Sequence, residues 1–185
     1  MKSTVLKYGT ISGLIMAILL FTTIPFASKM GFTAADMLLF FGKIIAFIPI
    51  FFGIRFFRQT IGERYITFWK AFNVGILIVV VCCVFYSISW NILYYWVSPD
   101  FPDKYFQFYI EQMKLHGALP KDITDAQTQF AESKKVLVNP LINGAYAFTD
   151  PITTGILSSL LCAALLRKTS PISNLPVELK DANQN

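Results

Sequence analysis

Residues 68–97 read FWKAFNVGILIVVVCCVFYSISWNILYYWV, an apolar run whose only charge is Lys70. A helix crosses roughly 30 Å of hydrocarbon with about 20 mostly apolar residues, and this run is longer than that. Trp69 lies near one end, and Trp90 and residues 94–96 add aromatic rings near the other. Aromatic side chains gather in this way at the two interfaces of a bilayer. The run therefore predicts a transmembrane helix.

Three further runs have the same apolar character, at about 5–27, 34–57 and 145–166. The chain is 55% hydrophobic and only 15% charged, whereas a soluble domain has about 25% charged residues. The first run is long for a signal peptide and no small-x-small cleavage pattern follows it, so we expect it to be retained. The sequence predicts an all-α protein, a bundle of four transmembrane helices within a single membrane domain over 1–168.

The segment 98–139 between the third and fourth runs is polar. Apolar residues repeat at helical spacing over about 103–116 and again from 120 to about 136, with Gly117 and Pro120 marking the break. We therefore expect a helical hairpin outside the membrane. The Pro- and Asn-rich residues 169–185 predict a disordered tail.

Basic residues predict the orientation of the bundle, because Lys and Arg near span ends favour the cytoplasmic side. With the N-terminus inside, that side holds nine basic residues: Lys2, Lys7, Arg55, Arg58, Arg64, Lys70, Arg167, Lys168 and Lys180. The other side holds six: Lys29, Lys104, Lys114, Lys121, Lys134 and Lys135. We expect both termini in the cytoplasm and an extracytoplasmic hairpin.

Lys43 is a charge inside the second run, and charged residues inside spans often mark function. Asp36 lies two helical turns earlier on the same face, and Asn73 and Asn91 add polar atoms in the third run. These four residues are the candidate intramembrane polar site. The interpretation that we favour is a lysine near the outer leaflet whose long side chain extends to the interface without a partner. Pro49 removes one backbone hydrogen bond and predicts a kink.

Other chemistry has little support in the sequence. The net charge of +5 comes from residues at span ends rather than from a binding stripe, so we expect no nucleic-acid partner. Cys82, Cys83 and Cys162 fall inside predicted spans, and His116 is the single histidine. Such a set forms no disulfide framework and no metal-ligand pattern. We expect no catalytic, cofactor or metal site, and a protein that is not an enzyme.

A set of short motifs in a fixed order accompanies this pattern. They are Tyr8-Gly9, Ser12-Gly13-Leu14, Phe51-Phe52-Gly53-Ile54-Arg55, Arg58, Ile66-Thr67-Phe68, Lys70-Ala71-Phe72, Val74-Gly75, Ser98-Pro99-Asp100-Phe101, Lys104-Tyr105, Ile110-Glu111-Gln112-Met113-Lys114 and Asn139-Pro140-Leu141. In this order the chain resembles an uncharacterised bacterial family of four-span membrane proteins, a domain of unknown function. The resemblance implies a bacterial inner-membrane protein and brings no activity or site residue.

Two functions are open at this point. Small-residue strips at Gly9, Gly13 and Ala17 and at Gly155, Ser159 and Ala163, with the aromatic hairpin, favour a non-enzymatic membrane scaffold or accessory subunit. Its partners would be the lipid bilayer and a second copy or another membrane protein. The alternative is a small oligomeric transporter or channel subunit with a polar site near Lys43. A continuous polar cavity reaching Lys43 would favour transport.

Overall fold

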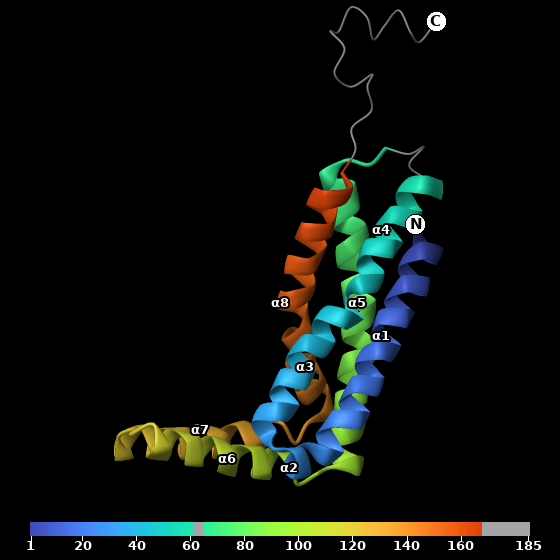
Figure 1. Cartoon of the computed structure of the whole chain (residues 1–185). Coiled ribbons are helices and arrows are strands. Elements are labelled where there is room, and N and C mark those ends of the chain that lie inside the picture. The colour runs from blue at the N-terminus through green and yellow to red at the C-terminus, as the bar shows by residue number, and fades with distance from the viewer. Residues whose placement is uncertain (61–64, 168–185) are drawn as a thin grey trace, which may run out of the picture.

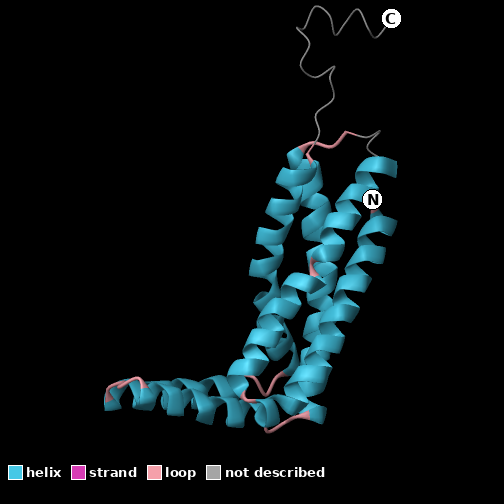
Figure 2. Ribbon diagram, viewed as in Figure 1, coloured by secondary structure: helices cyan, strands magenta, loops and turns pink. Residues whose placement is uncertain are grey.

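The computed structural model describes residues 1–60 and 65–167, and its elements are helices (Figure 1; Figure 2). In chain order they are α1 (Lys2–Thr23), a 3-10 turn (Ile24–Phe26), α2 (Ala27–Met30), α3 (Phe32–Ala46), α4 (Ile48–Thr60), α5 (Phe68–Ile92), a π-helical turn (Leu93–Val97), α6 (Phe101–Leu115), α7 (Pro120–Val136) and α8 (Pro140–Leu166). The expected disordered tail and Arg64 lie outside the described residues.

Four helical stretches of the described residues are long and apolar enough to cross a membrane: Lys2–Met30, Phe32–Thr60, Phe68–Val97 and Pro140–Leu166. The predicted all-α bundle of four spans is therefore confirmed, and the protein is a multi-pass membrane protein. The fourth helix begins at Pro140 rather than near residue 145, because Asn139 caps it by accepting a hydrogen bond from the Leu141 N–H.

Helix α5 is the centre of the bundle and packs most extensively against α1 and α8 (Figure 1). Glycines make these contacts close. A Cβ atom added at Gly13 of α1 would lie 2.6 Å from Phe85, and one added at Gly155 of α8 would lie 2.4 Å from Val79. The small-residue strips therefore face α5 of the same chain, where they let the helix backbones approach.

The second span is broken into α3 and α4 at Phe47, two residues before Pro49, and Figure 1 shows the change of direction. Proline has no N–H to donate to the preceding turn, so the helical ladder cannot continue through it. The predicted kink is confirmed. Because of this kink, α3 runs in a different direction from α4 and contacts α8.

The helical hairpin between the third and fourth spans consists of α6 and α7, and it extends sideways from one end of the bundle (Figure 1). Its helices are joined by a ring stack of Phe106 on Phe130, with centroids 4.0 Å apart, and by an ion pair of Lys134 with Asp103 at 2.6 Å. The start of α1 and the end of α8 lie at the opposite end of the bundle from the hairpin (Figure 1).

The root of the hairpin is fixed to α3 by aromatic rings. Phe32, the first residue of α3, contacts the rings of Phe101, Tyr105 and Phe108 on α6, with centroid distances from 5.2 to 6.1 Å. The Tyr105 hydroxyl also donates a hydrogen bond of 3.0 Å to Asp36. The orientation of the hairpin is therefore tied to the position of α3.

The Tyr105–Asp36 contact predicts a pH dependence. Burial, together with the hydrogen bond and the negative charge of Asp36, raises the pKa of Tyr105 to about 12. Because the pKa of this phenol is higher in the folded state, the stabilisation is present below about pH 10 and is lost as the pH rises through 12. We expect the ultraviolet titration of wild type minus Tyr105→Phe to show one tyrosine that ionises near pH 12. A difference centred near pH 10 would contradict the contact.

Candidate functional site

Three side chains from three helices meet at one carboxylate, that of Asp150, whose side chain is 46% exposed. The Lys43 ammonium on α3 donates to both oxygens of Asp150 on α8, at 2.8 Å and 2.7 Å. The Tyr86 hydroxyl on α5 donates to the Asp150 Oδ2 atom at 2.6 Å. Hydrogen bonds with an ionised partner are short and about twice as strong as neutral ones. We call Lys43, Tyr86 and Asp150 the Asp150 cluster.

The Asp150 cluster lies well below the end of the bundle that carries the hairpin. Asp150 is ten residues beyond Pro140, the first residue of α8, which corresponds to about 15 Å along the helix axis. Lys43 is eleven residues beyond Phe32, and Tyr86 is eleven residues before Val97. With a hydrocarbon thickness of about 30 Å, this level is far from both aqueous phases.

Pairing explains how Lys43 is tolerated in the span. Its side chain is 18% exposed and bound to Asp150. The expectation of a lysine that extends to the interface without a partner is therefore wrong. An unpaired lysine at the centre of a span costs about 2.5–3.5 kcal/mol on insertion scales. Asp150, held by Lys43 and Tyr86, supplies the compensating charge.

A fourth span that begins near residue 145 would put Asp150 in its opening turns, and this expectation is wrong. Helix α8 starts ten residues earlier, at Pro140, so the carboxylate lies within the span. Pro151 follows it inside α8 and cannot donate to the carbonyl of Ala147. One turn of α8 beside the Asp150 cluster therefore has a backbone carbonyl without its usual helical partner.

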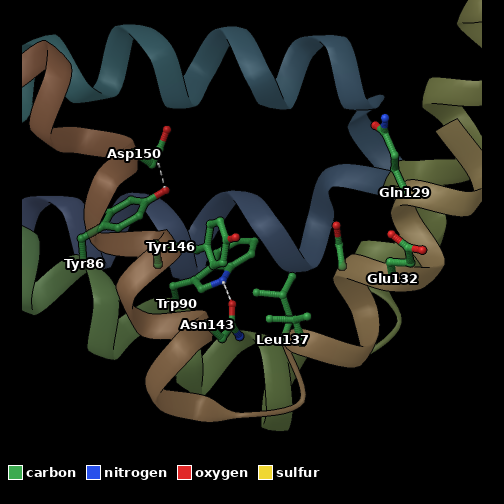
Figure 3. A pocket seen from close by; sticks show the side chains of 11 residues that line it. Tyr86, Trp90, Gln129, Glu132, Leu137, Asn143, Tyr146 and Asp150 are labelled. Atoms are coloured by element: carbon green, nitrogen blue, oxygen red, sulfur yellow. Dashed lines mark hydrogen bonds between the residues drawn. The ribbon is translucent and has the colours of Figure 1, made fainter. Parts of the chain in front are cut away.

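A cavity of about 690 Å³ leads from the hairpin to the Asp150 cluster, between α5, α7 and α8 (Figure 3). Its lining residues are Tyr86, Trp90, Gln129, Glu132, Ser133, Val136, Leu137, Asn143, Tyr146, Ala147 and Asp150. Ligand pockets commonly have volumes of about 300–1,000 Å³, with mainly apolar walls and a few polar groups. This cavity has the size and the wall chemistry of such a site.

Asn143 gives the cavity wall a polar atom without a partner. Its side-chain oxygen accepts a hydrogen bond of 3.1 Å from the Trp90 indole N–H, as drawn in Figure 3. Among the described residues the Asn143 Nδ2 atom has no hydrogen-bond partner, although Asn143 is only 2% exposed. Leaving a buried donor unsatisfied costs about 1–3 kcal/mol. Nδ2 is therefore available to an acceptor on a ligand or a water molecule.

The structure does not bring the four predicted site residues together. Asp36 accepts from Tyr105 at the hairpin root, and Asn73 lies exposed on α5 with no side-chain hydrogen bond among the described residues. The Asn91 amide donates to the Ser87 carbonyl at 3.0 Å. Of the predicted set, Lys43 alone belongs to the Asp150 cluster.

The residues that sequence reasoning missed are Asp150, Tyr86 and Asn143. A signal for Asp150 was present, because an acidic residue in one apolar run can neutralise a lysine in another. Tyr86 and Asn143 carried no comparable signal, since tyrosine and asparagine occur throughout this chain.

Comparison with known proteins places the chain in a family. Neither the curated proteins nor the solved structures contain a match to it. A family model matches residues 7–168, a range that includes the hairpin and almost all of the four spans. Its description is "Protein of unknown function (DUF4199)". The chain therefore belongs to this family of proteins of unknown function.

Proposed function

We propose that this protein is a non-enzymatic, ligand-binding membrane subunit, a small oligomeric transporter or channel subunit whose cavity ends at the Asp150 cluster. The single observation that carries the proposal is the cavity itself, which connects the hairpin end of the bundle with a carboxylate about 15 Å deeper. Charged residues at such depth face a cavity or another charge, and here Asp150 does both.

The same contacts weaken one argument for a scaffold. Small-residue strips favour a partner helix only where they are free, and Gly13 and Gly155 already lie against α5. The proposed protein assembles as an oligomer, because four spans provide few surfaces for a transport path. Its lipid-facing belt of exposed apolar side chains offers the contact surface for copies.

Charge supports a bacterial inner-membrane location with both termini in the cytoplasm. Arg55 and Arg58 near the end of α4, and Arg167 after α8, lie at the end of the bundle opposite the hairpin. Arg58 donates a hydrogen bond of 3.0 Å to the carbonyl of Leu166, which helps to close this end. The positive-inside rule then places the hairpin and the mouth of the cavity outside.

The test is the access of water to the deep part of the cavity. Ala147 lines the cavity one turn above Asp150, and it is replaced by cysteine in a Cys82→Ala, Cys83→Ala, Cys162→Ala background. We expect Ala147→Cys to react with a membrane-impermeant thiol reagent added outside intact cells, because the cavity admits water. Ala164→Cys, on the exposed lipid face of the same helix, is the matched control and should stay unreactive. An unreactive Ala147→Cys protein would refute an outward-open binding cavity.

A scaffold or accessory subunit is kept as the second candidate because of the hairpin tip. Leu115 and Leu119 are 78% and 66% exposed there, which is unusual for large apolar residues beyond the spans. If the tip binds a partner protein, a photo-crosslinker at position 115 should form one defined adduct, and the same group at exposed Glu111 should not. Crosslinks to lipid alone would contradict the scaffold function.

A further inference from the structure

We propose that the cavity binds an amphiphile with one ammonium headgroup, an acceptor oxygen next to it and an apolar tail. This inference rests on the proposed function and names the ligand class of the same site. Four features of the cavity wall carry it: its charge, its aromatic rings, the free Asn143 amide and the apolar grooves beside it.

The first feature is the charge of the wall. Within the part of the chain that the structure describes, Glu132 and Asp150 are the two acidic residues of the wall, and no lysine or arginine lines it. Asp150 already has Lys43 as its counter-ion, whereas Glu132 has no ion pair within residues 1–60 and 65–167. With Lys43 included, the site carries one net negative charge. It therefore suits a monocation and offers no charge partner to a phosphate group.

Aromatic rings are the second feature. Tyr86, Trp90 and Tyr146 all line the cavity, and Figure 3 shows Trp90 and Tyr146 across from Glu132 and Gln129 of α7. The faces of such rings attract an ammonium group, with a gain of about 0.5–2 kcal/mol that grows when the cation is desolvated. An ammonium between these rings and Glu132 would have both kinds of partner.

The third feature is the unpartnered Asn143 Nδ2 donor, which is buried in the cavity wall. Its orientation is fixed because the amide oxygen is bound by Trp90. A hydrogen-bond donor cannot stabilise the ammonium itself, so it requires an acceptor on the ligand. An ester or amide oxygen a few bonds from the ammonium would satisfy Nδ2 and remove the penalty of a buried, unpaired donor.

The apolar grooves along the outer half of α8 are the fourth feature. A groove of about 420 Å³ is lined by Leu141, Ile142, Ala145, Tyr146 and Thr149, and it shares Tyr146 with the cavity. A second groove shares Leu141 and Ala145 with the first. An apolar tail can continue from the cavity along this path without leaving the membrane. The continuity of cavity and groove selects an amphiphile over a small hydrophilic amine.

The test uses lauroylcholine, which combines a quaternary ammonium, an ester carbonyl and an apolar chain. The full-length protein in phosphatidylglycerol nanodiscs, whose lipid has no ammonium group, is dialysed to equilibrium against labelled lauroylcholine, and binding to empty nanodiscs is subtracted. We expect saturable binding at least about tenfold tighter than that of 3,3-dimethylbutyl laurate, in which carbon replaces the charged nitrogen. Equal binding of the uncharged isostere would overturn the proposal.

Variants locate the binding in the cavity. Glu132→Gln and Tyr146→Leu should each weaken lauroylcholine binding by about 3- to 10-fold, because each removes one partner of the ammonium. Both residues are largely exposed, so these changes leave the bundle core intact. Glu111→Gln on α6, which is exposed and outside the cavity, is the matched control and should bind as wild type. Wild-type affinity in both cavity variants would also overturn the proposal.

Two further arms separate the alternatives. We expect unchanged affinity in nanodiscs containing phosphatidylethanolamine, because the cavity offers no charge partner to the phosphate group of that lipid. A fall in affinity there would show that a zwitterionic lipid competes for the cavity, and it would overturn the inference of a ligand with one ammonium and no phosphate. A reactive Ala147→Cys protein that binds no lauroylcholine would end this inference and leave the proposed function standing. An unreactive Ala147→Cys protein would end the proposed function.

Discussion

Gly155→Leu is expected to separate α8 from α5 and to lower the free energy of unfolding by about 3 kcal/mol. A Cβ atom at this position would lie 2.4 Å from the Val79 Cγ1 atom, closer than any carbon contact allows. Helix α5 cannot move away from α8 easily, because α1 packs against another side of it. That contact is equally close, since a Cβ atom added at Gly13 of α1 would lie 2.6 Å from the Phe85 side chain of α5. The measurement is reversible unfolding of the purified protein in mixed micelles.

The matched control is Ala164→Leu, which adds the same kind of side chain to an exposed position of α8. Extra methylenes there meet lipid rather than a helix, so we expect a change of less than about 0.5 kcal/mol. If both variants were equally stable, the close packing of α8 on α5 would be wrong.

The helices of this fold could be predicted from the sequence, but which helices pack against each other could not. The length and hydrophobicity of residues 68–97 require a span, and Gly155, Ser159 and Ala163 lie four apart and therefore share a helix face. That face predicts close packing but does not say against which helix. The structure shows that the partner is α5, whose position depends on the whole bundle rather than on a local pattern.

The candidate site could be predicted only in part, for a related reason. Lys43 stands out because it interrupts an apolar run, but its partner Asp150 is 107 positions away. Helical periodicity describes one helix at a time and contains no information on such pairs. Once the structure identifies Tyr86, periodicity explains why Asn73 is not part of the cluster: at about 100° per residue this side chain lies roughly 220° around α5 from Tyr86. The exposure of Asn73 agrees with that count.

Asp150→Asn is expected to destabilise the protein by about 2.5–3.5 kcal/mol, the second large effect. Asparagine has nearly the same shape and still offers an oxygen that accepts hydrogen bonds, so the change mainly leaves the Lys43 ammonium without a counter-charge. Asp103→Asn is the control, because it breaks the exposed pair with Lys134, and such pairs contribute about 0–1 kcal/mol. The comparison is made by the same micellar unfolding measurement.

The double variant Lys43→Met, Asp150→Asn separates stability from function. It removes both charges and keeps the acceptor for Tyr86, so stability should return to within about 1 kcal/mol of wild type, since apolar replacements of internal ion pairs are often neutral. A pair kept only for packing would then leave a stable protein with unchanged lauroylcholine binding. If the charges serve the cavity, the stable double variant should bind lauroylcholine several-fold more weakly, because the Asp150 carboxylate no longer faces the ligand's ammonium group. Failure to recover stability in the double variant would contradict a direct Lys43–Asp150 pair, since two coupled residues must give non-additive effects.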